Sequence, residues 1–143
     1  MKKMFVILFL TAVISAKVTK AQTVGVPDTL AYLQTIVANK SQYIGQPFSI
    51  LLNNLQIQIK YFHPRRDIVY DISKETSTRF GFYFPQSANE LYLTYPSLEI
   101  YWQPYLNANQ SDALWENNNG GGWSTAVAAF YANGIITDIK VRE

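Results

Sequence analysis

The sequence predicts an α+β domain in which an N-terminal helical hairpin packs on one face of an antiparallel sheet of about four to six strands. Two observations predict this fold. Apolar residues recur at helical spacing after Asp28, and from Gln56 onward short stretches alternate polar and apolar residues. Strands joined in series by short links pair antiparallel, and helices gathered at one end of the chain are typical of the α+β class.

The first 21 residues are expected to be a secretory signal peptide. Lys2 and Lys3 precede an apolar run over residues 4–16, which is shorter than the about 20 residues that span a bilayer. The small residue Ala21 before Gln22 favours cleavage. We therefore expect one domain over residues 22–143, located in the periplasm or outside the cell, with no membrane span after cleavage. An uncleaved membrane anchor is the alternative.

Two helices are predicted at the start of this domain. Asp28 can cap the first helix, whose apolar residues recur every three or four positions: Leu30, Leu33, Ile36 and Val37. Pro47 favours a helix start because its φ is fixed. The second helix has a similar apolar stripe: Phe48, Leu51, Leu52 and Leu55. Gly45 lies in the turn between them, so a hairpin is expected.

Strands are predicted where apolar side chains alternate, over residues 56–61, 78–84, 91–95 and 98–102. A short edge strand is also expected at 68–72, after an interruption at 63–67. Asn133-Gly134 is a hairpin signal, because both residues tolerate positive φ. It favours a strand over residues 126–132, although this alanine-rich segment also has the composition of a helix. The last strand is expected to place Ile135, Thr137, Ile139 and Val141 on one face.

One face of the predicted sheet is left without a helix. If Phe80, Leu93 and Ile100 meet the helices, the opposite face carries Arg79, Tyr83, Tyr92, Thr94, Glu99 and Tyr101. An antiparallel sheet can leave one face in water, and tyrosines there can simply stabilise cross-strand pairs. They can also bind a partner, because rigid aromatic rings supply contact area at low entropic cost. Tyr83, Tyr92 and Tyr101 are therefore candidate binding residues.

The stretch WENNNGGGW runs from Trp115 to Trp123. Three glycines and three asparagines disfavour regular structure, so this stretch can be a plain connection. It can equally be a binding loop, in which either tryptophan stacks on a ligand and the amides of Asn117, Asn118 and Asn119 form hydrogen bonds. That combination is typical of sites for neutral sugars, and also of loops that insert into a protein partner.

No catalytic or metal-binding constellation is evident. The chain has no cysteine and a single histidine, His63, which excludes a structural zinc site and a thiol nucleophile. Neither a G-x-S-x-G elbow nor a nucleotide-binding glycine motif is present. We therefore expect no catalytic residue, no metal and no cofactor. The alternative is a carbohydrate-active hydrolase that uses carboxylates near the aromatic residues: Glu99, Asp112 or Glu116.

The charges and the composition favour a binding protein. After residue 21 the chain carries eight basic and ten acidic residues, and the basic ones are scattered, with Arg65-Arg66 their only adjacent pair. Nucleic-acid-binding domains instead have a clustered basic face. We therefore expect no nucleic-acid partner. The expected function is non-enzymatic binding of a protein or an extracellular glycan.

The order of helix, glycine-containing turn, helix and antiparallel strands resembles small exported proteins of the beta-lactamase-inhibitor-protein shape, which the outer-membrane assembly lipoprotein E shares. The resemblance covers residues 43–52 (YIGQPFSILL), the strand after them and Asn133-Gly134-Ile135. The lipid-anchor cysteine of the lipoprotein and the disulfide cysteines of the inhibitor are absent. The resemblance implies a non-enzymatic scaffold that binds through an aromatic sheet face, and it assigns a role to no single residue.

Overall fold

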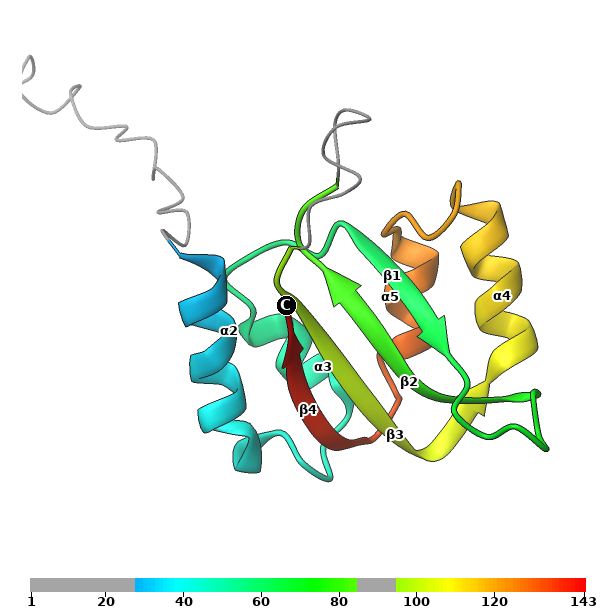
Figure 1. Ribbon diagram of the computed structural model, residues 1–143, viewed down its shortest axis with the longest axis horizontal. Coiled ribbons are helices and arrows are strands. Elements are labelled where there is room, and N and C mark those ends of the chain that lie inside the picture. The colour runs from blue at the N-terminus through cyan, green and yellow to red at the C-terminus, as the bar shows by residue number, and fades with distance from the viewer. Residues whose placement is uncertain (1–27, 85–94) are drawn as a thin grey trace, which may run out of the picture.

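The computed structural model describes residues 28–84 and 95–143, which form helices and one antiparallel sheet (Figure 1). The α+β class is therefore confirmed. Four strands follow one another in the sheet in chain order: β1 (Tyr61–Arg65), β2 (Lys74–Gly81), β3 (Ser97–Asn107) and β4 (Ile136–Arg142). The helices are α2 (Thr29–Ala38), α3 (Phe48–Asn54), α4 (Ala108–Asn117) and α5 (Thr125–Tyr131), with a short 3₁₀ turn at Lys40–Gln42.

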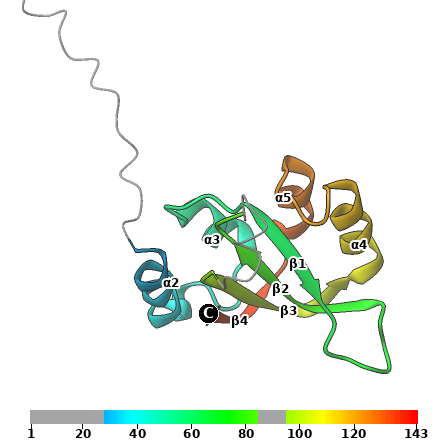
Figure 2. The ribbon, with the colours of Figure 1, turned by 45° about the horizontal axis from the view of Figure 1, so that its top comes forward.

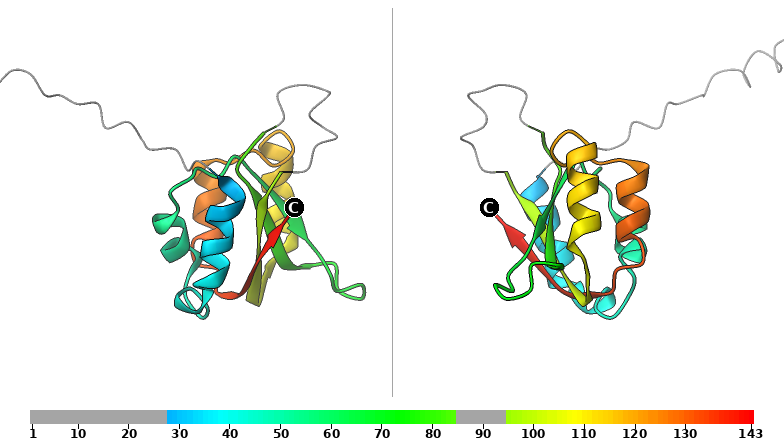
Figure 3. Two further views of the ribbon diagram at one scale, coloured as in Figure 1. Left: turned by 60° about the vertical axis from the view of Figure 1, so that its left-hand side comes forward. Right: turned by 90° about the vertical axis from the view of Figure 1, so that its right-hand side faces the viewer.

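The helices form one layer and the sheet forms the other. In the left view of Figure 3, α2, α3 and α5 lie on one side of the strands, while α4 overlaps them. In the right view α4 and α5 lie to one side, while α2 overlaps the strands, and Figure 2 shows the same arrangement turned. Helix α2 contacts β3 and β4, whereas α4 contacts β1 and β2. The other side of the sheet meets no described helix, and we call it the open face.

The first N-terminal helix begins where the sequence predicts, and the second begins one residue later than predicted, at Phe48. Asp28 caps α2, because its side chain accepts a hydrogen bond of 3.1 Å from the backbone N–H of Ala31. Leu33 and Ile36 then face the core. Pro47 directly precedes Phe48, which is the first residue of α3 and has a buried side chain. Packing of α2 and α3 as a hairpin stays a prediction.

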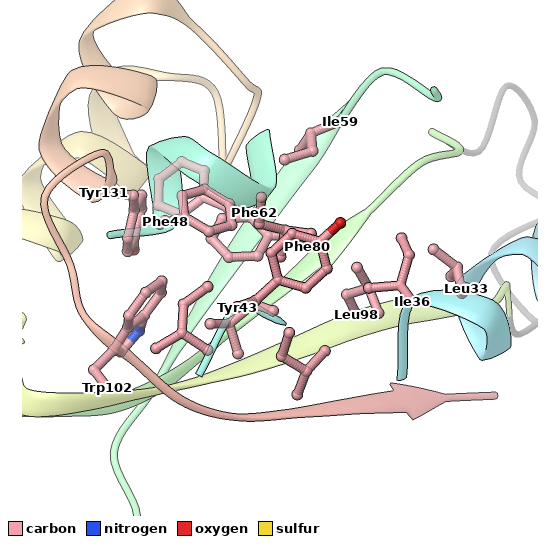
Figure 4. Close-up of a cluster of buried hydrophobic side chains, with 14 of the residues drawn as sticks. Leu33, Ile36, Tyr43, Phe48, Ile59, Phe62, Phe80, Leu98, Trp102 and Tyr131 are labelled. Atoms are coloured by element: carbon pink, nitrogen blue, oxygen red, sulfur yellow. The ribbon is translucent and has the colours of Figure 1, made fainter. Parts of the chain in front are cut away.

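The core is an aromatic cluster around Phe80 of β2 (Figure 4). The Phe80 ring is stacked on Phe48 at 4.8 Å and makes edge contacts with Tyr131 at 5.3 Å and Trp123 at 5.7 Å between ring centroids. The expected face of β3 is confirmed, since Leu98, Ile100 and Trp102 are all buried. Aromatic pairs of this kind contribute about 0.5–1.5 kcal/mol each beyond the area that they bury.

The strand favoured over residues 126–132 is wrong, because this segment is helix α5. Ser124 caps it by accepting a hydrogen bond from the Val127 N–H, and alanine is the best helix former. Asn133-Gly134 consequently joins a helix to β4 and does not form a hairpin between strands. In β4 the buried residues are Ile136 and Ile139, because the register shifts opposite Tyr101 and Trp102. Thr137 is exposed, so the single face predicted for this strand is also wrong.

The first strand starts later than the sequence predicts. Strand β1 covers Tyr61–Arg65 and includes His63 and Pro64, which were expected to interrupt it. Pro64 is tolerated because β1 is at the edge of the sheet. Residues 68–72 form a turn and not an edge strand, and β2 ends at Gly81. The strand expected at 91–95 lies almost wholly outside the described residues.

Helix α4 was not predicted. Its sequence is mostly polar and gives little apolar periodicity, and only Ala108 and Ser111 are buried. Asn107 caps it by accepting a hydrogen bond of 3.1 Å from the Gln110 N–H. A polar helix that leaves most of its surface in water cannot be recognised from a hydrophobic stripe.

A polar network lies under α4 and α5. The carboxyl group of Glu75 is fully buried and accepts hydrogen bonds from the hydroxyls of Thr78 and Tyr131, the latter at 3.0 Å. The indole N–H of Trp102 donates to the Thr78 hydroxyl at 2.8 Å. Burial raises the pKa of Glu75 despite these hydrogen bonds, and burial together with Glu75 raises the pKa of Tyr131.

This raised pKa predicts the sign of a pH effect on stability. Because the fold favours the protonated carboxyl of Glu75, its contribution is present at low pH and is lost as the pH rises through its pKa in the folded protein. Glu75→Gln should therefore gain unfolding free energy relative to wild type as the pH rises above the usual pKa of a glutamate, about 4.3. Urea unfolding at several pH values measures this difference. Glu116→Gln on the exposed side of α4 is the control, and a pH-independent difference for Glu75→Gln would contradict the prediction.

Candidate functional site

The open face carries a compact set of charged side chains. Three rows of residues run across the four strands on this face, read from β1 to β4: Tyr61, Gly81, Ser97 and Arg142; His63, Arg79, Glu99 and Lys140; and Arg65, Ser77, Tyr101 and Asp138. Their neighbours along each strand, such as Phe62 and Phe80, point to the core. The alternation of a β-strand thus separates the apolar core from this charged face.

Glu99 lies at the centre of the open face, and only 2% of it is exposed. Its carboxylate forms ion pairs with Arg142 and, at 3.3 Å, with the Nε of Arg65. The Ser77 hydroxyl donates a hydrogen bond of 3.2 Å to it. Burial alone raises the pKa of Glu99, but the hydrogen bond and charge of Arg142, with Ser77 and Arg65, outweigh burial and lower it. Glu99 is therefore an anion at neutral pH.

The solvent side of the open face is positive. Arg65, Arg142 and Lys140 keep between 39% and 48% of their side chains exposed, although the two arginines pair with the carboxylate beneath them. The second carboxylate of this face, Asp138, pairs with Lys40 from the turn after α2 at 2.5 Å. Four cationic side chains, including Arg79, therefore face two carboxylates that are already paired.

Two tyrosines stiffen this surface. The Tyr101 hydroxyl accepts a hydrogen bond of 3.2 Å from Arg142, and the Lys140 ammonium lies 4.5 Å from the centre of the Tyr101 ring. The Tyr61 ring lies over Gly81, where any Cβ atom would overlap it. Tyr101 thus contacts the charged ends of Arg142 and Lys140, whose side chains stay partly exposed.

His63 is on the open face in β1, beside Arg79. Partial burial of its ring and the positive charges of Arg65 and Arg79 lower its pKa. The imidazole is thus neutral at neutral pH and adds hydrogen-bonding atoms, not charge, to this surface.

The predicted tyrosines are separated by the structure. Tyr101 lies on the open face as expected. Tyr83 follows the end of β2, and its ring lies tilted against that of Tyr95 at 4.3 Å between ring centroids, beside a small pocket that also involves Thr29 of α2. Tyr92 lies outside the described residues. The expected tyrosine-rich face is therefore, over the described residues, a face of arginine and lysine with two tyrosines.

The WENNNGGGW stretch is an ordered helix end. The backbone N–H groups of Gly120 and Gly121 both donate to the Trp115 carbonyl at 3.0 Å, and Asn119 has a positive φ of 54°. Asn118 donates its side-chain amide to the Leu114 carbonyl at 2.7 Å. These are the local bonds by which polar residues satisfy the last carbonyls of a helix. Asn117 is the last residue of α4.

The same stretch is tied to the edge of the sheet. The Phe62 N–H donates to the Gly121 carbonyl at 2.8 Å, and the Trp123 N–H donates to the Lys60 carbonyl at 3.0 Å. Trp115 is 36% exposed, whereas Trp123 packs its ring against Phe80 and is half-buried. The loop borders β1, and Tyr101 lies on the central strand β3. The structure therefore does not bring the two parts of the predicted site into one surface.

The candidate acids are distributed over two elements. Glu99 is on β3, while Asp112 and Glu116 are on α4, where Asp112 forms an ion pair with Arg66. Among the described residues no group of three or more histidine and acidic side chains is placed to hold a metal ion. In the same parts of the chain, no helix combines the length and the apolar character required to cross a bilayer.

The sequence alone does not identify Arg65, Lys140 and Arg142 as the cations around Glu99. They are far apart in the chain, and the basic residues therefore look scattered. The alternation in β4 does indicate a charged strand face, because every second residue is charged: Asp138, Lys140 and Arg142. The expectation of no nucleic-acid partner rested on that scatter, and this reason no longer holds.

Comparisons with known proteins give no further assignment: no protein family, no curated protein and no solved structure matches the chain.

Removing the charge of Glu99 should destabilise the protein. Glu99→Gln leaves Arg65 and Arg142 close together without their shared anion, and we expect a loss of about 1–3 kcal/mol in unfolding free energy at neutral pH. Because the pKa of Glu99 is lowered in the fold, the loss should disappear as the pH falls through that pKa, below about 4.3. Asp112→Asn, which breaks a more exposed ion pair, is the control and should cost at most about 1 kcal/mol. Equal effects of the two variants in urea unfolding would contradict this account.

The close approach of the loop to β1 predicts that alanine destabilises the protein more at Gly121 than at Gly45. Gly121 has a φ of 100°, and a Cβ atom there would overlap the Phe62 carbonyl and the Trp115 ring. Gly45 also has a positive φ, of 77°, but nothing lies within 4 Å of its Cβ position. Gly121→Ala should therefore cost clearly more than the about 1–2 kcal/mol of backbone strain expected for Gly45→Ala. Thermal or urea unfolding of both variants measures the difference, and similar losses would show that the loop can move away from β1.

Proposed function

We propose that this protein is an exported, non-enzymatic binding module that holds the acidic surface of a protein partner on its open face. The observation that carries this proposal is the arrangement of Arg65, Arg79, Lys140 and Arg142 around the buried carboxylate of Glu99. Charge complementarity across an interface increases the association rate and selects the partner more than it adds affinity.

The buried carboxylate supports binding by ordering the cations. Arginine and lysine side chains lose rotamer entropy when a partner immobilises them. Here Glu99 and Tyr101 already hold the guanidinium group of Arg142, and the Lys140 ammonium lies over the Tyr101 ring. Part of that entropy is therefore lost on folding, before a partner arrives. Guanidinium groups also bind carboxylates through two parallel hydrogen bonds, which adds geometric selectivity.

An extracellular glycan is the second candidate partner, and Trp115 is the observation that favours it. The ring is 36% exposed at the edge of the sheet, and its position is fixed by close contact with Gly120 and Gly121. A fixed aromatic ring can stack on the CH face of a sugar. This site lies apart from the open face, so the two candidates make separable predictions.

The proposal also includes the arrangement of the helices and strands and the export of the protein from the cytoplasm. We infer a helical hairpin of α2 and α3 on a sheet of four to six strands, supported by the contact of Phe48 with Phe80 and by α2 beside β3 and β4. Export rests on the signal-like residues 1–21, and the interaction scaffold rests in part on the resemblance to the beta-lactamase-inhibitor-protein shape.

The proposal predicts selective binding of polyanions through the open face. We expect residues 22–143 to bind a polyglutamate peptide, and Arg79→Gln with Lys140→Gln to weaken it about five- to ten-fold, since two ion pairs are lost. Lys60→Gln with Arg66→Gln removes the same charge outside the three rows of the open face and is the matched control, since Arg66 pairs with Asp112 of α4. Titration calorimetry at low and high salt measures both.

Three other outcomes have defined meanings. Equal weakening by the two double variants would contradict the proposal, because net charge alone would explain it. Tighter binding of a single-stranded oligonucleotide, with the same dependence on Arg79 and Lys140, would replace the protein partner by nucleic acid. Binding of a neutral oligosaccharide that is lost in Trp115→Ala would support the glycan alternative instead.

A further inference from the structure

The connection between β1 and β2 exposes three apolar side chains. In the turn over residues 66–73, Val69 is 92% exposed, Tyr70 is 94% exposed and Ile72 is 68% exposed. We call these three residues the tip. Figures 1 and 2 show that this connection projects well beyond the end of the sheet. Tight turns are normally made from glycine, proline and small polar residues, so the fold itself does not require apolar side chains here.

Polar bonds hold the turn in a shape that keeps the tip in water. The Asp71 N–H donates to the Ile68 carbonyl at 3.2 Å and closes the turn around Val69 and Tyr70. The Asp71 carboxylate accepts hydrogen bonds from the backbone N–H and the hydroxyl of Ser73 and pairs with Lys74 at 2.9 Å. The tip is therefore presented by a bonded turn, and its exposure does not come from a lack of local contacts.

The tip lies on the same side of the molecule as the positive face. In both views of Figure 3 the connection projects away from the helices, toward the side of the open face. At its base Lys74 is exposed, and the hydrogen bond and charge of Asp71, with smaller contributions from the nearby Tyr70 and Tyr105, raise the pKa of Lys74. Tyr105 is itself exposed on β3. Apolar, tyrosine and lysine side chains are thus combined around one protruding turn.

We propose that the tip inserts into the headgroup region of an anionic lipid bilayer and so anchors the domain at a membrane surface. A convex apolar tip needs no matching pocket in a fluid bilayer, tyrosine is enriched at the membrane interface, and lysine can extend to the headgroups. The nearby carboxylate of Asp71 is already paired with Lys74.

Charge complementarity selects the anionic surface. The open face adds Arg65, Arg79, Lys140 and Arg142 on the side toward which the tip projects, and its two carboxylates are paired. Each basic side chain near an anionic surface adds attraction that decays within a Debye length. This inference does not rest on the proposed function, since the tip lies outside the open face.

Vesicle sedimentation tests the proposal directly. The probe is residues 22–143, which contain every residue of the buried core, from Leu33 to Ile139. It is mixed with vesicles of phosphatidylglycerol and phosphatidylcholine, or of phosphatidylcholine alone. We expect binding to the anionic vesicles, and a loss of about ten-fold or more in the variant with Val69→Ser, Tyr70→Ser and Ile72→Ser. Ile50→Ser removes an exposed apolar residue from α3 and should bind as wild type does.

A fluorescent label gives a second readout at the tip. The chain has no cysteine, so Val69→Cys and Ile50→Cys each accept one environment-sensitive label. The label at position 69 should shift to the blue when anionic vesicles are added, and the label at position 50 should not. Failure of wild type to sediment, an unchanged affinity of the tip variant, or no shift at position 69 would each overturn the proposal. Failure to sediment would favour a protein, in place of a bilayer, as the partner that contacts the tip.

The two proposals can fail separately. Arg79→Gln with Lys140→Gln should abolish most polyglutamate binding but only weaken vesicle binding, because the tip is intact. The tip variant should lose vesicle binding and keep its affinity for polyglutamate. If the tip variant lost both, the tip would be part of the open-face site and the proposal of a separate membrane anchor would be overturned.

Discussion

Phe80 contacts the rings of Phe48, Trp102, Trp123 and Tyr131, which come from α3, from β3, and from the start and end of the α5 region. A single residue of β2 thus joins the sheet to two helices and to the connection between α4 and α5. Large aromatic side chains dominate core energetics because each buries a large apolar area. This cluster decides which face of the sheet is covered, and everything on the open face depends on that choice.

The open face is the side of the sheet that no described helix covers. Alternation places polar residues there, but the arrangement found is more specific than a solvated surface. Glu99 is buried, and its carboxylate pairs with the guanidinium groups of Arg65 and Arg142. A buried ion pair is weak evidence for stability, because desolvation offsets much of the Coulomb attraction. Its clearer effect here is to position two arginines whose side chains remain 39% and 44% exposed.

Local sequence signals predict only part of the fold and of the charged open face. The helix cap at Asp28 and the buried face of Leu98, Ile100 and Trp102 depend on neighbouring residues, and both were found. Helix α4 was missed because it buries almost no apolar residue, and α5 was assigned to a strand because Asn133-Gly134 outweighed its alanines. The cluster around Glu99 was missed because cross-strand register brings together residues up to 77 positions apart, Arg65 and Arg142.

The central claim is that the arginines around Glu99 form the surface that a partner contacts. The side-chain Nε–H signals of the four arginines in a ¹H–¹⁵N NMR spectrum test it most directly, because each signal reports on one guanidinium group. Arg66 pairs with Asp112 of α4 and serves as an internal reference. On titration with a polyglutamate peptide, the account predicts that the signals of Arg65, Arg79 and Arg142 shift while that of Arg66 does not. Equal shifts of all four signals, or shifts confined to the tryptophan side chains, would contradict it.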